Sequence, residues 1–386
     1  NQVFSDPGAW YHMVQVWDSG NATAGNRMRW YVNGAEVTLF STDTNPSEDL
    51  ESYWNSSGSI ATIGSFRSPD GSSNTGTSSN GDYYLAEFVF CDGQAYTPSD
   101  FGEYDEDSPT IWKPKDVSGL TFGNNGFYLD FEDSSNLGND KNGGTDFTEV
   151  NIAAADQATD TPTNNFCVMN PLDNHLAAGT FSEGNCQVAT NAGNTTWGTS
   201  TFGLSKGCWY YEVKFPSGSV GGGETMGIID RPTASTSASP YNGSSAKNAI
   251  WRSGGDLYIN DSNNTDFTPS GGDLWVADNI MGVYIDLDNS KIYCSINGVM
   301  KNSGTGVSIT AISSTINGVY FPTFGDSNSA STTFQFNFGG CSAFAISSAA
   351  SDANNYGNFE YSPTVTVDGS TKSFYAICTK NLAEYG

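Results

Sequence analysis

The chain has 386 residues, of which 37% are hydrophobic, 13% aromatic and 15% charged, and it carries 42 acidic against 15 basic residues, a formal net charge of −27. The abundance of Gly, Ser, Thr, Asn and aromatics over Lys, Glu and Leu predicts an all-β protein with many turns, long enough for two domains. A surface this negative repels phosphate backbones and anionic lipids, so nucleic acid binding and membrane insertion are not expected.

The first predicted elements are a strand at residues 10–18, WYHMVQVWD, and a hairpin at residues 27–40, RMRWYVNGAEVTLF. The hairpin turns on Asn33-Gly34, which tolerate the positive φ angles of a type I′ turn. After a polar stretch and the apolar run IATIGSF, residues 83–101 predict a strand followed by a short turn that ends near Phe101.

These pieces resemble the second half of a laminin-G-like domain of the concanavalin A-like lectin/glucanase superfamily. The matching motifs are WYH, WYVNG, IG and YLAEF, and they cover residues 1 to about 110. The resemblance implies an antiparallel β-sandwich over residues 1–130 whose N-terminal half is missing. The opening residues, which lack a signal-peptide pattern, accordingly look like the middle of a domain.

A series of motifs in fixed order is similar to structural proteins of tailed phages of marine bacteria. The motifs are WYH, YVNG, YLAEFVFCDGQAYTPSDFGE, WKPK and GFYLDFEDSSNLGND. Residues 131–165 then have little periodicity and many turn formers, which predicts a connector.

The second predicted domain spans residues 166–345. GCWYYEVKF at residues 207–215 alternates well, and residues 278–301 predict two consecutive hairpins, the second on Asn297-Gly298. WYYEV, MGI, GVYIDLDNSKIYCSINGV, YFPTFG and FNFG resemble a SPRY domain, also a β-sandwich, in the order of that family. Residues 346–386 resemble the tail that follows this unit in the phage proteins. The two Asn-Gly hairpins are therefore interpreted as structural parts of two separate sandwiches.

The cysteines predict free buried thiols rather than a disulfide framework, as in a protein folded in a reducing cytosol. The chain has seven cysteines, which are widely spaced and contain no CxxC pair: Cys91, Cys167, Cys186, Cys208, Cys294, Cys341 and Cys378.

The sequence offers few candidate residues for catalysis or metal binding. EYDED at residues 103–107 lacks the E-x-D-x-x-E spacing of retaining glucanases, so an acidic surface loop is expected there. His12 and His175 are the two histidines, and a structural role is expected for both. No cofactor is expected. Calcium at residues 130–140 or 258–266 stays open, although Asx turns explain these carboxylates better than the EF-hand spacing does.

Loops on a rigid β-scaffold are the remaining place for binding. Aromatic rings beside carboxylate or guanidinium groups suit sugar recognition. The candidate ligand-binding residues are Asp230, Arg231, Tyr241, Trp251, Arg252, Tyr53 and Trp54. Trp251 also alternates like a core residue.

The expected function is that of a virion structural or appendage protein, a tail fibre or capsid decoration. It is expected to bind a host-surface glycan or protein without catalysis, as an extracellular homo-oligomer beside other virion proteins. Two alternatives remain: a polysaccharide-active enzyme whose catalytic half lies upstream, and a secreted bacterial adhesin.

Overall fold

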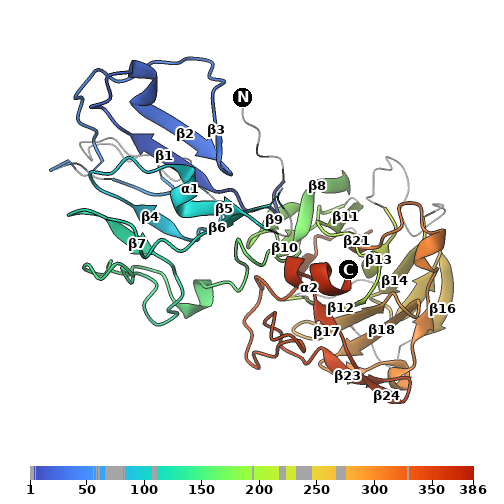
Figure 1. Cartoon of the computed structure of the whole chain (residues 1–386). Helices are drawn as coiled ribbons and strands as arrows, with labels where there is room; N and C mark the ends of the chain where they lie inside the picture. The colour runs from blue at the N-terminus through green and yellow to red at the C-terminus, as the bar shows by residue number, and fades with distance from the viewer. Residues whose placement is uncertain are drawn as a thin grey trace. The chain divides into compact units, whose positions relative to one another are not determined.

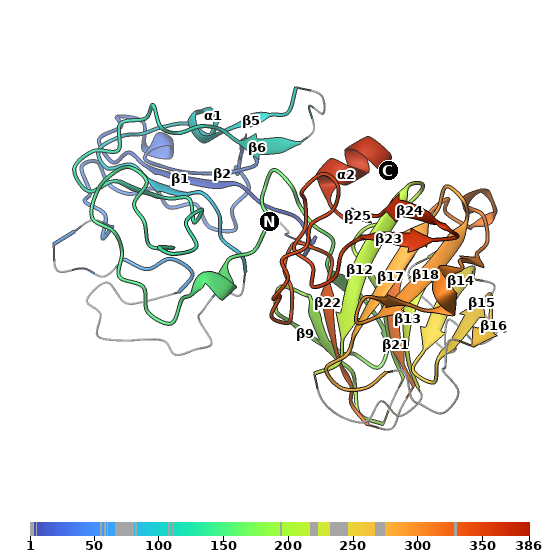
Figure 2. The same ribbon diagram turned by 90° about the horizontal axis from the view of Figure 1, so that it is seen from below.

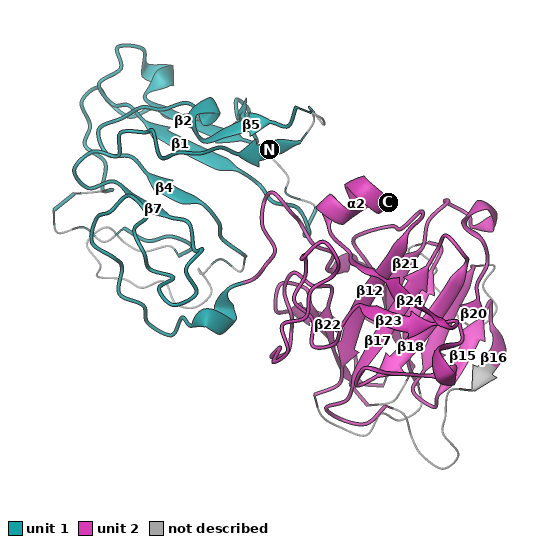
Figure 3. Cartoon of the chain, turned by 60° about the horizontal axis from the view of Figure 1, so that its bottom comes forward, with its two compact units in different colours: residues 1–157 teal, residues 158–386 magenta. Residues whose placement is uncertain are grey.

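The computed structural model describes residues 4, 6–54, 56–57, 59, 61–65, 81, 83–106, 109, 111–193, 195–216, 223–231, 246–266, 275–327 and 330–386. It divides into two compact units, unit 1 (Asn1–Gln157) and unit 2 (Ala158–Gly386) (Figure 3). In the described residues of both units the regular structure is mainly antiparallel strands, which confirms the predicted all-β fold class. The division falls inside the segment 131–165 that was predicted as a connector.

Unit 1 contains three small antiparallel sheets among its described residues (Figure 1). They are β1 (Met13–Trp17), β2 (Met28–Val32) and β3 (Ala35–Glu36); β4 (Phe88–Phe90) with β7 (Phe127–Leu129); and β5 (Gly102–Tyr104) with β6 (Trp112–Pro114). The one-turn helix α1 (Pro98–Phe101) follows Thr97, whose backbone N–H donates to the Asp100 carboxylate at 2.7 Å. Phe101 packs on a small core of Val14, Val16 and Tyr31.

The first Asn-Gly hairpin is anchored by contacts that cross the unit. Asn33 and Gly34 have φ of 47° and 79°, as a type I′ turn requires, and the backbone N–H of His12 donates to Asn33 Oδ1 at 2.8 Å. Gly34 lies against the Trp112 ring, because a Cβ there would stand 2.4 Å from the indole. Trp112 Nε1 in turn donates to His12 Nδ1 at 2.8 Å. The hairpin and His12 thus take part in one structural contact set.

Unit 2 is a two-layered β-sandwich (Figures 1 and 2). In its described residues one sheet has nine strands: β9 (Thr180–Ser182), β10 (Gln187–Ala189), β12 (Cys208–Lys214), β17 (Ile280–Asp286), β18 (Lys291–Ile296), β19 (Val299–Met300), β20 (Val307–Ser308), β22 (Thr333–Asn337) and β25 (Tyr375–Ala376). The other has seven: β8 (Met169–Leu176), β11 (Thr196–Ser200), β13 (Glu224–Ile229), β14 (Asn248–Arg252), β15 (Asp256–Ile259), β16 (Ser262–Asp266) and β21 (Phe321–Asp326).

A few short elements complete the described structure. They are the hairpin strands β23 (Thr364–Val367) and β24 (Ser370–Ser373), the helix α2 (Thr379–Tyr385), and the 3₁₀ turns Ala24–Asn26, Ala154–Asp156, Asn302–Gly304 and Ile312–Ser314. None of the helices in the described part of the chain has the length and apolar character to cross a membrane.

Strand β12 is buried on both faces. Trp209, Tyr211 and Val213 point into the core between the two sheets, as the alternation predicts. Tyr210 faces the other way, into a second cluster that contains Phe359 and Phe374 of the C-terminal segment. Residues 346–386 therefore supply an outer layer on the nine-stranded sheet, except that Tyr375 and Ala376 join the sheet itself as β25, which pairs in parallel with β12.

Polar contacts hold this outer layer in place. The buried Glu212 carboxylate accepts the backbone N–H groups of Glu360 and Tyr361 at 3.1 and 2.8 Å. Asn381 Nδ2 donates to Asp352 Oδ2 at 2.7 Å inside the layer itself. The predicted C-terminal extension is consequently part of the fold of unit 2.

The second Asn-Gly hairpin repeats the geometry of the first. Asn297 and Gly298 have φ of 48° and 75°, and the N–H of Ile280 donates to Asn297 Oδ1 at 2.9 Å. A Cβ on Gly298 would stand 2.7 Å from the ring of Tyr361 in the outer layer. In both units an Asn side chain closes the turn and the glycine makes room for an aromatic ring.

The cysteine prediction needs a correction. Cys186 and Cys341 form a disulfide that joins segments 155 residues apart in sequence. The five other cysteines are free, and Cys167, Cys208, Cys294 and Cys378 among them are buried. Wide spacing did not reveal the bond, because the two partners meet only through the fold.

Candidate functional site

The loop after β13 uses its charged groups internally. Asp230 is 1% exposed, and its carboxylate accepts the N–H of Ile316 at 3.1 Å and Nε of Arg231 at 3.1 Å. These bonds tie two loops of the sandwich together, so they explain Asp230 and Arg231 without a ligand. Tyr241, the third candidate of this loop, lies outside the described residues.

Trp251 and Arg252 are neighbours on β14 that face opposite sides of the sheet. Trp251 is 1% exposed and packs edge-on against Trp275 in the core, which corrects its predicted role in ligand contact. Arg252 lies 5.3 Å above the Tyr258 ring and donates to its hydroxyl at 3.3 Å. Close by on the same hairpin, Asn263 Nδ2 donates to Asp256 Oδ1 at 3.1 Å. Arg252 thus belongs to a half-buried polar cluster.

Tyr53 and Trp54 of unit 1 lie at the surface, with 68% and 38% of their area exposed. The Trp54 ring is 5.7 Å from Phe90, Phe90 is 5.7 Å from Phe127, and Phe127 is 4.8 Å from Phe147. We call Trp54, Phe88, Phe90, Phe127 and Phe147 the aromatic face. None of these five side chains is fully buried.

Strand alternation creates this face. Phe90 pairs with Phe127 and Phe88 pairs with Leu129, so the four side chains share one side of the β4–β7 sheet. Beyond the paired residues of this sheet, Asn125 Nδ2 donates to Asp92 Oδ2 at 3.1 Å. Sequence reasoning missed this carboxylate–amide pair, because its members are 33 residues apart in the chain.

The opposite side of the same sheet is polar. Tyr128 donates a hydrogen bond to the Glu87 carboxylate, and Lys141 pairs with Asp130 at 2.8 Å and Glu132 at 3.2 Å. Burial is the main reason why the pKa of Glu87 is raised, and the pKa of Tyr128 is raised by burial and by the neighbouring carboxylate. These groups satisfy one another, so their contacts with each other account for this side of the sheet.

The residues weighed for catalysis have structural surroundings. Glu103 and Tyr104 of EYDED lie in β5, a strand rather than the expected loop, and both are exposed. His175 Nε2 lies 2.7 Å from Asp173 Oδ1, and Thr199 Oγ1 donates to the other oxygen of Asp173 at 2.5 Å. This trio joins β8 to β11 at the edge of the seven-stranded sheet. Its bonds account for the buried Asp173 without invoking a reaction.

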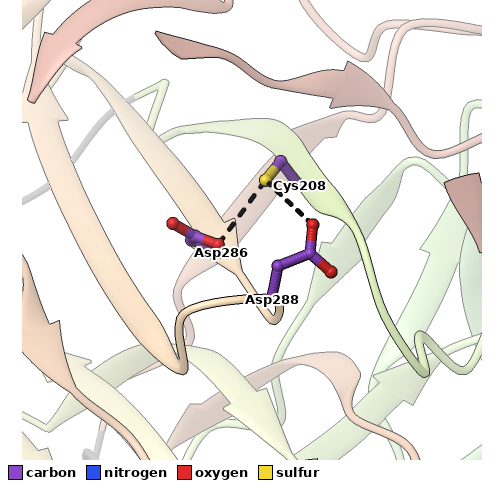
Figure 4. Close-up of side chains that lie close together, drawn as sticks. All are labelled: Cys208, Asp286 and Asp288. Atoms are coloured by element: carbon purple, nitrogen blue, oxygen red, sulfur yellow. Dashed lines mark hydrogen bonds between the residues drawn. The ribbon is translucent and has the colours of Figure 1, made fainter. Parts of the chain in front are cut away.

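Cys208, Asp286 and Asp288 come close together where β12 meets the β17–β18 turn (Figure 4). The Asp286 carboxylate already accepts from Asn289, through its N–H at 3.0 Å, and from Lys372 of the outer layer. Burial raises the pKa of the Cys208 thiol to about 12, so a thiolate ligand is unfavourable here. The Lys372 ammonium supplies the positive charge that a metal ion would otherwise bring.

The acidic stretches considered for calcium are bonded locally. Asp140 accepts the N–H groups of Tyr128 at 2.9 Å, Asn142 at 3.1 Å and Gly144 at 3.1 Å, and Asp133 accepts that of Ser135 at 2.9 Å. Asp261 Oδ1 accepts from Asn248 Nδ2 at 3.2 Å. The bonds to Asn142 and Ser135 have the Asx-turn spacing that the turn interpretation expects, whereas those to Tyr128 and Asn248 join separate segments.

Comparisons with known proteins add little. No family model matches the chain, and no curated protein is significantly similar to it. Among solved structures, the SPRY domain of human HERC1 is similar at 14% identity, with 46% of this chain and 99% of that chain covered and a TM-score of 0.34. A similarity with this TM-score supports no conclusion about the chain. The sandwich of unit 2 is established by its own strand pairing.

Proposed function

We propose that the chain is a non-catalytic recognition protein, a virion appendage or capsid-decoration component that attaches to a glycan or protein on the host surface. The observation that carries the proposal is the aromatic face of unit 1, which includes the predicted contact Trp54. Trp54 and Phe147 of this face are exposed and its other three rings are half-buried, and exposed apolar side chains that group together often mark a binding surface.

The scaffold supports this proposal. Unit 2 is a sandwich with a continuous core and a further outer layer, which suits a protein that must stay folded outside a cell. His12 and His175, with Asp173 beside His175, are engaged in bonds that hold strands and loops together. The ordered motif series, similar to tailed-phage structural proteins, supports a place on a virion, with other virion proteins and further copies of the chain as partners.

The test compares binding of the purified chain to host-cell surfaces with that of Trp54→Ala. We expect wild type to bind and the variant to lose about tenfold in affinity, since a central aromatic contact commonly has that weight. Ile316→Ala, at a side chain 59% exposed in unit 2, is the matched control and should bind like wild type. Equal binding by all three, or by none, would contradict the proposal. Immunolabelling of particles by electron microscopy tests the virion location.

A further inference from the structure

We infer that one end of the sandwich in unit 2 holds a calcium ion, bound by the carboxylates of Glu224 and Asp326 and by the hydroxyl of Ser253. The three residues come from three neighbouring strand ends: Glu224 begins β13, Asp326 ends β21, and Ser253 directly follows β14. The site belongs to unit 2 and goes beyond the recognition function proposed above.

The register of the seven-stranded sheet brings these side chains together. Glu224 pairs with Asp326 across β13 and β21. Met226 and Phe324, two residues away on the same strands, point into the core between the two sheets. Because side chains two residues apart share a face, both carboxylates point the same way. The N–H of Ser253 donates to Glu224 O at 3.0 Å and continues the β13–β14 ladder, which places the serine side chain beside that of Glu224.

Two threonines from the nine-stranded sheet support this orientation. Thr190 follows β10, and its hydroxyl donates to Asp326 Oδ2 at 2.5 Å. Thr332 precedes β22, and its hydroxyl donates to Glu224 Oε1 at 3.1 Å. The N–H of Thr332 also donates to Thr190 Oγ1 at 2.8 Å, which links the two contacts. The carboxylates therefore lie between the sheets, at the end where these strands begin or end.

Charge and burial favour a cation at this place. Glu224 and Asp326 are both 0% exposed, and they are cross-strand neighbours. Two ionised carboxylates side by side in a buried setting repel each other, and a divalent cation between them neutralises both charges. The row offers carboxylate and hydroxyl oxygens, which suit Ca²⁺, whereas Zn²⁺ prefers nitrogen and sulfur ligands.

Ser253 is an independent indication of a ligand. The residue is 4% exposed, and within the described part of the chain its Oγ has no hydrogen-bond partner. A buried hydroxyl in that state costs free energy, which coordination of a cation would offset. Ca²⁺ takes about six to eight oxygen ligands, which the two carboxylates, this hydroxyl and water can supply together.

The experiment titrates Ca²⁺ into the whole chain, freed of metal with EGTA, by calorimetry, and records thermal unfolding with and without the ion. We expect Ca²⁺ to bind and to raise the unfolding temperature of unit 2, because an ion that binds only the folded state stabilises it. Glu224→Gln should abolish this binding. Ser253→Ala should weaken it by about tenfold, since affinity follows the number and charge of the ligands. Circular dichroism of each variant checks that the strands are retained.

Stability without Ca²⁺ separates a ligand from a structural residue. In EGTA, Ser253→Ala should be at least as stable as wild type, because the substitution removes a buried hydroxyl without a partner. Asp133→Asn, at an exposed carboxylate in the acidic stretch 130–140 of unit 1, is the control and should bind Ca²⁺ like wild type.

Four results would overturn the inference. One is a wild-type protein that neither binds Ca²⁺ nor is stabilised by it. Another is binding that survives both Glu224→Gln and Ser253→Ala, which would place the ion elsewhere. A third is binding lost in Asp133→Asn but kept in Glu224→Gln. The last is an equal loss of stability in Ser253→Ala with and without Ca²⁺, which would give the serine a purely structural role.

Discussion

Glu212 is a carboxylate without exposed surface that bonds to four groups on several segments. Besides the two N–H groups of the outer layer, it accepts from the Tyr210 hydroxyl at 2.9 Å and from Asn337 Nδ2 at 2.9 Å. Burial raises the pKa of Glu212 from 4.5 to about 7, and the four donors offset part of that shift. The protonated form can be accommodated, because the Tyr210 hydroxyl can rotate to accept.

This shift predicts a pH-dependent stability of unit 2. Since the folded-state pKa lies above the unfolded value, the contribution of Glu212 is fully present below pH 4.5 and is lost as the pH rises through about 7. The full shift corresponds to roughly 3 kcal/mol at 1.36 kcal/mol per pKa unit. Urea unfolding at several pH values should show the wild type losing stability over this window.

Glu212→Gln isolates that contribution. The variant should be less stable at low pH by roughly 1–3 kcal/mol, because the Gln amide places a donor against donors. Its stability should fall less than that of wild type between pH 4.5 and 7, so the two curves converge. Glu183→Gln, at an exposed side chain, is the control and should run parallel to wild type. Parallel curves for Glu212→Gln would refute the assignment.

At the scale of elements, two hairpins of unit 2 form a natural comparison. Gly298 and Gly369 have φ of 75° and 76°, but a Cβ on Gly298 would meet Tyr361 at 2.7 Å whereas one on Gly369 would meet nothing within 4 Å. Gly369→Ala should therefore cost about 1 kcal/mol for the backbone alone, and Gly298→Ala clearly more.

A double variant checks that interpretation. In a Tyr361→Ala background, the added effect of Gly298→Ala on the free energy of unfolding should drop to that of Gly369→Ala. If the two glycine substitutions are equally costly in the wild-type background, contact with the ring is not what requires glycine at position 298.

Local patterns predicted much at this scale. The alternation of GCWYYEVKF predicted β12, and the two Asn-Gly pairs predicted type I′ turns that the φ angles confirm. The contacts that fix these elements could not be predicted from local sequence, because Tyr210 meets Phe359 and Gly34 meets Trp112 only after the chain has folded. The same reason hid the pairing of Asp92 with Asn125, 33 residues away, whereas Trp54 could be proposed from residue type alone.

At the scale of the whole molecule, the two units differ in core size. Among the described residues, seven buried apolar side chains lie in unit 1 and forty-eight in unit 2. Unit 1 should accordingly unfold at lower temperature or denaturant than unit 2, in a separate transition.

Reduction of the Cys186–Cys341 disulfide should affect only the second transition. Opening a link between residues 155 apart in sequence should cost unit 2 roughly 2–5 kcal/mol, as in the loop-entropy account of disulfides. Calorimetry with and without a thiol reductant measures the shift in the unfolding temperature of unit 2. In a Cys186→Ser/Cys341→Ser protein the reductant should leave that temperature unchanged. A reductant effect confined to the first transition would contradict this division of the chain.

The outer layer of unit 2 also bears on how the chain is made. Glu212 is 148 residues upstream of Glu360, whose backbone N–H it accepts. Trp209 and Tyr210 likewise pair with Tyr375 and Ala376, which are synthesised much later. During translation unit 1 can fold early, but the outer side of β12 stays uncovered until residues 346–386 have left the ribosome. Until then the side of the sheet that carries Tyr210, Tyr284 and Tyr293 lacks its cover, and exposed apolar surface of this kind favours aggregation of a partly folded chain.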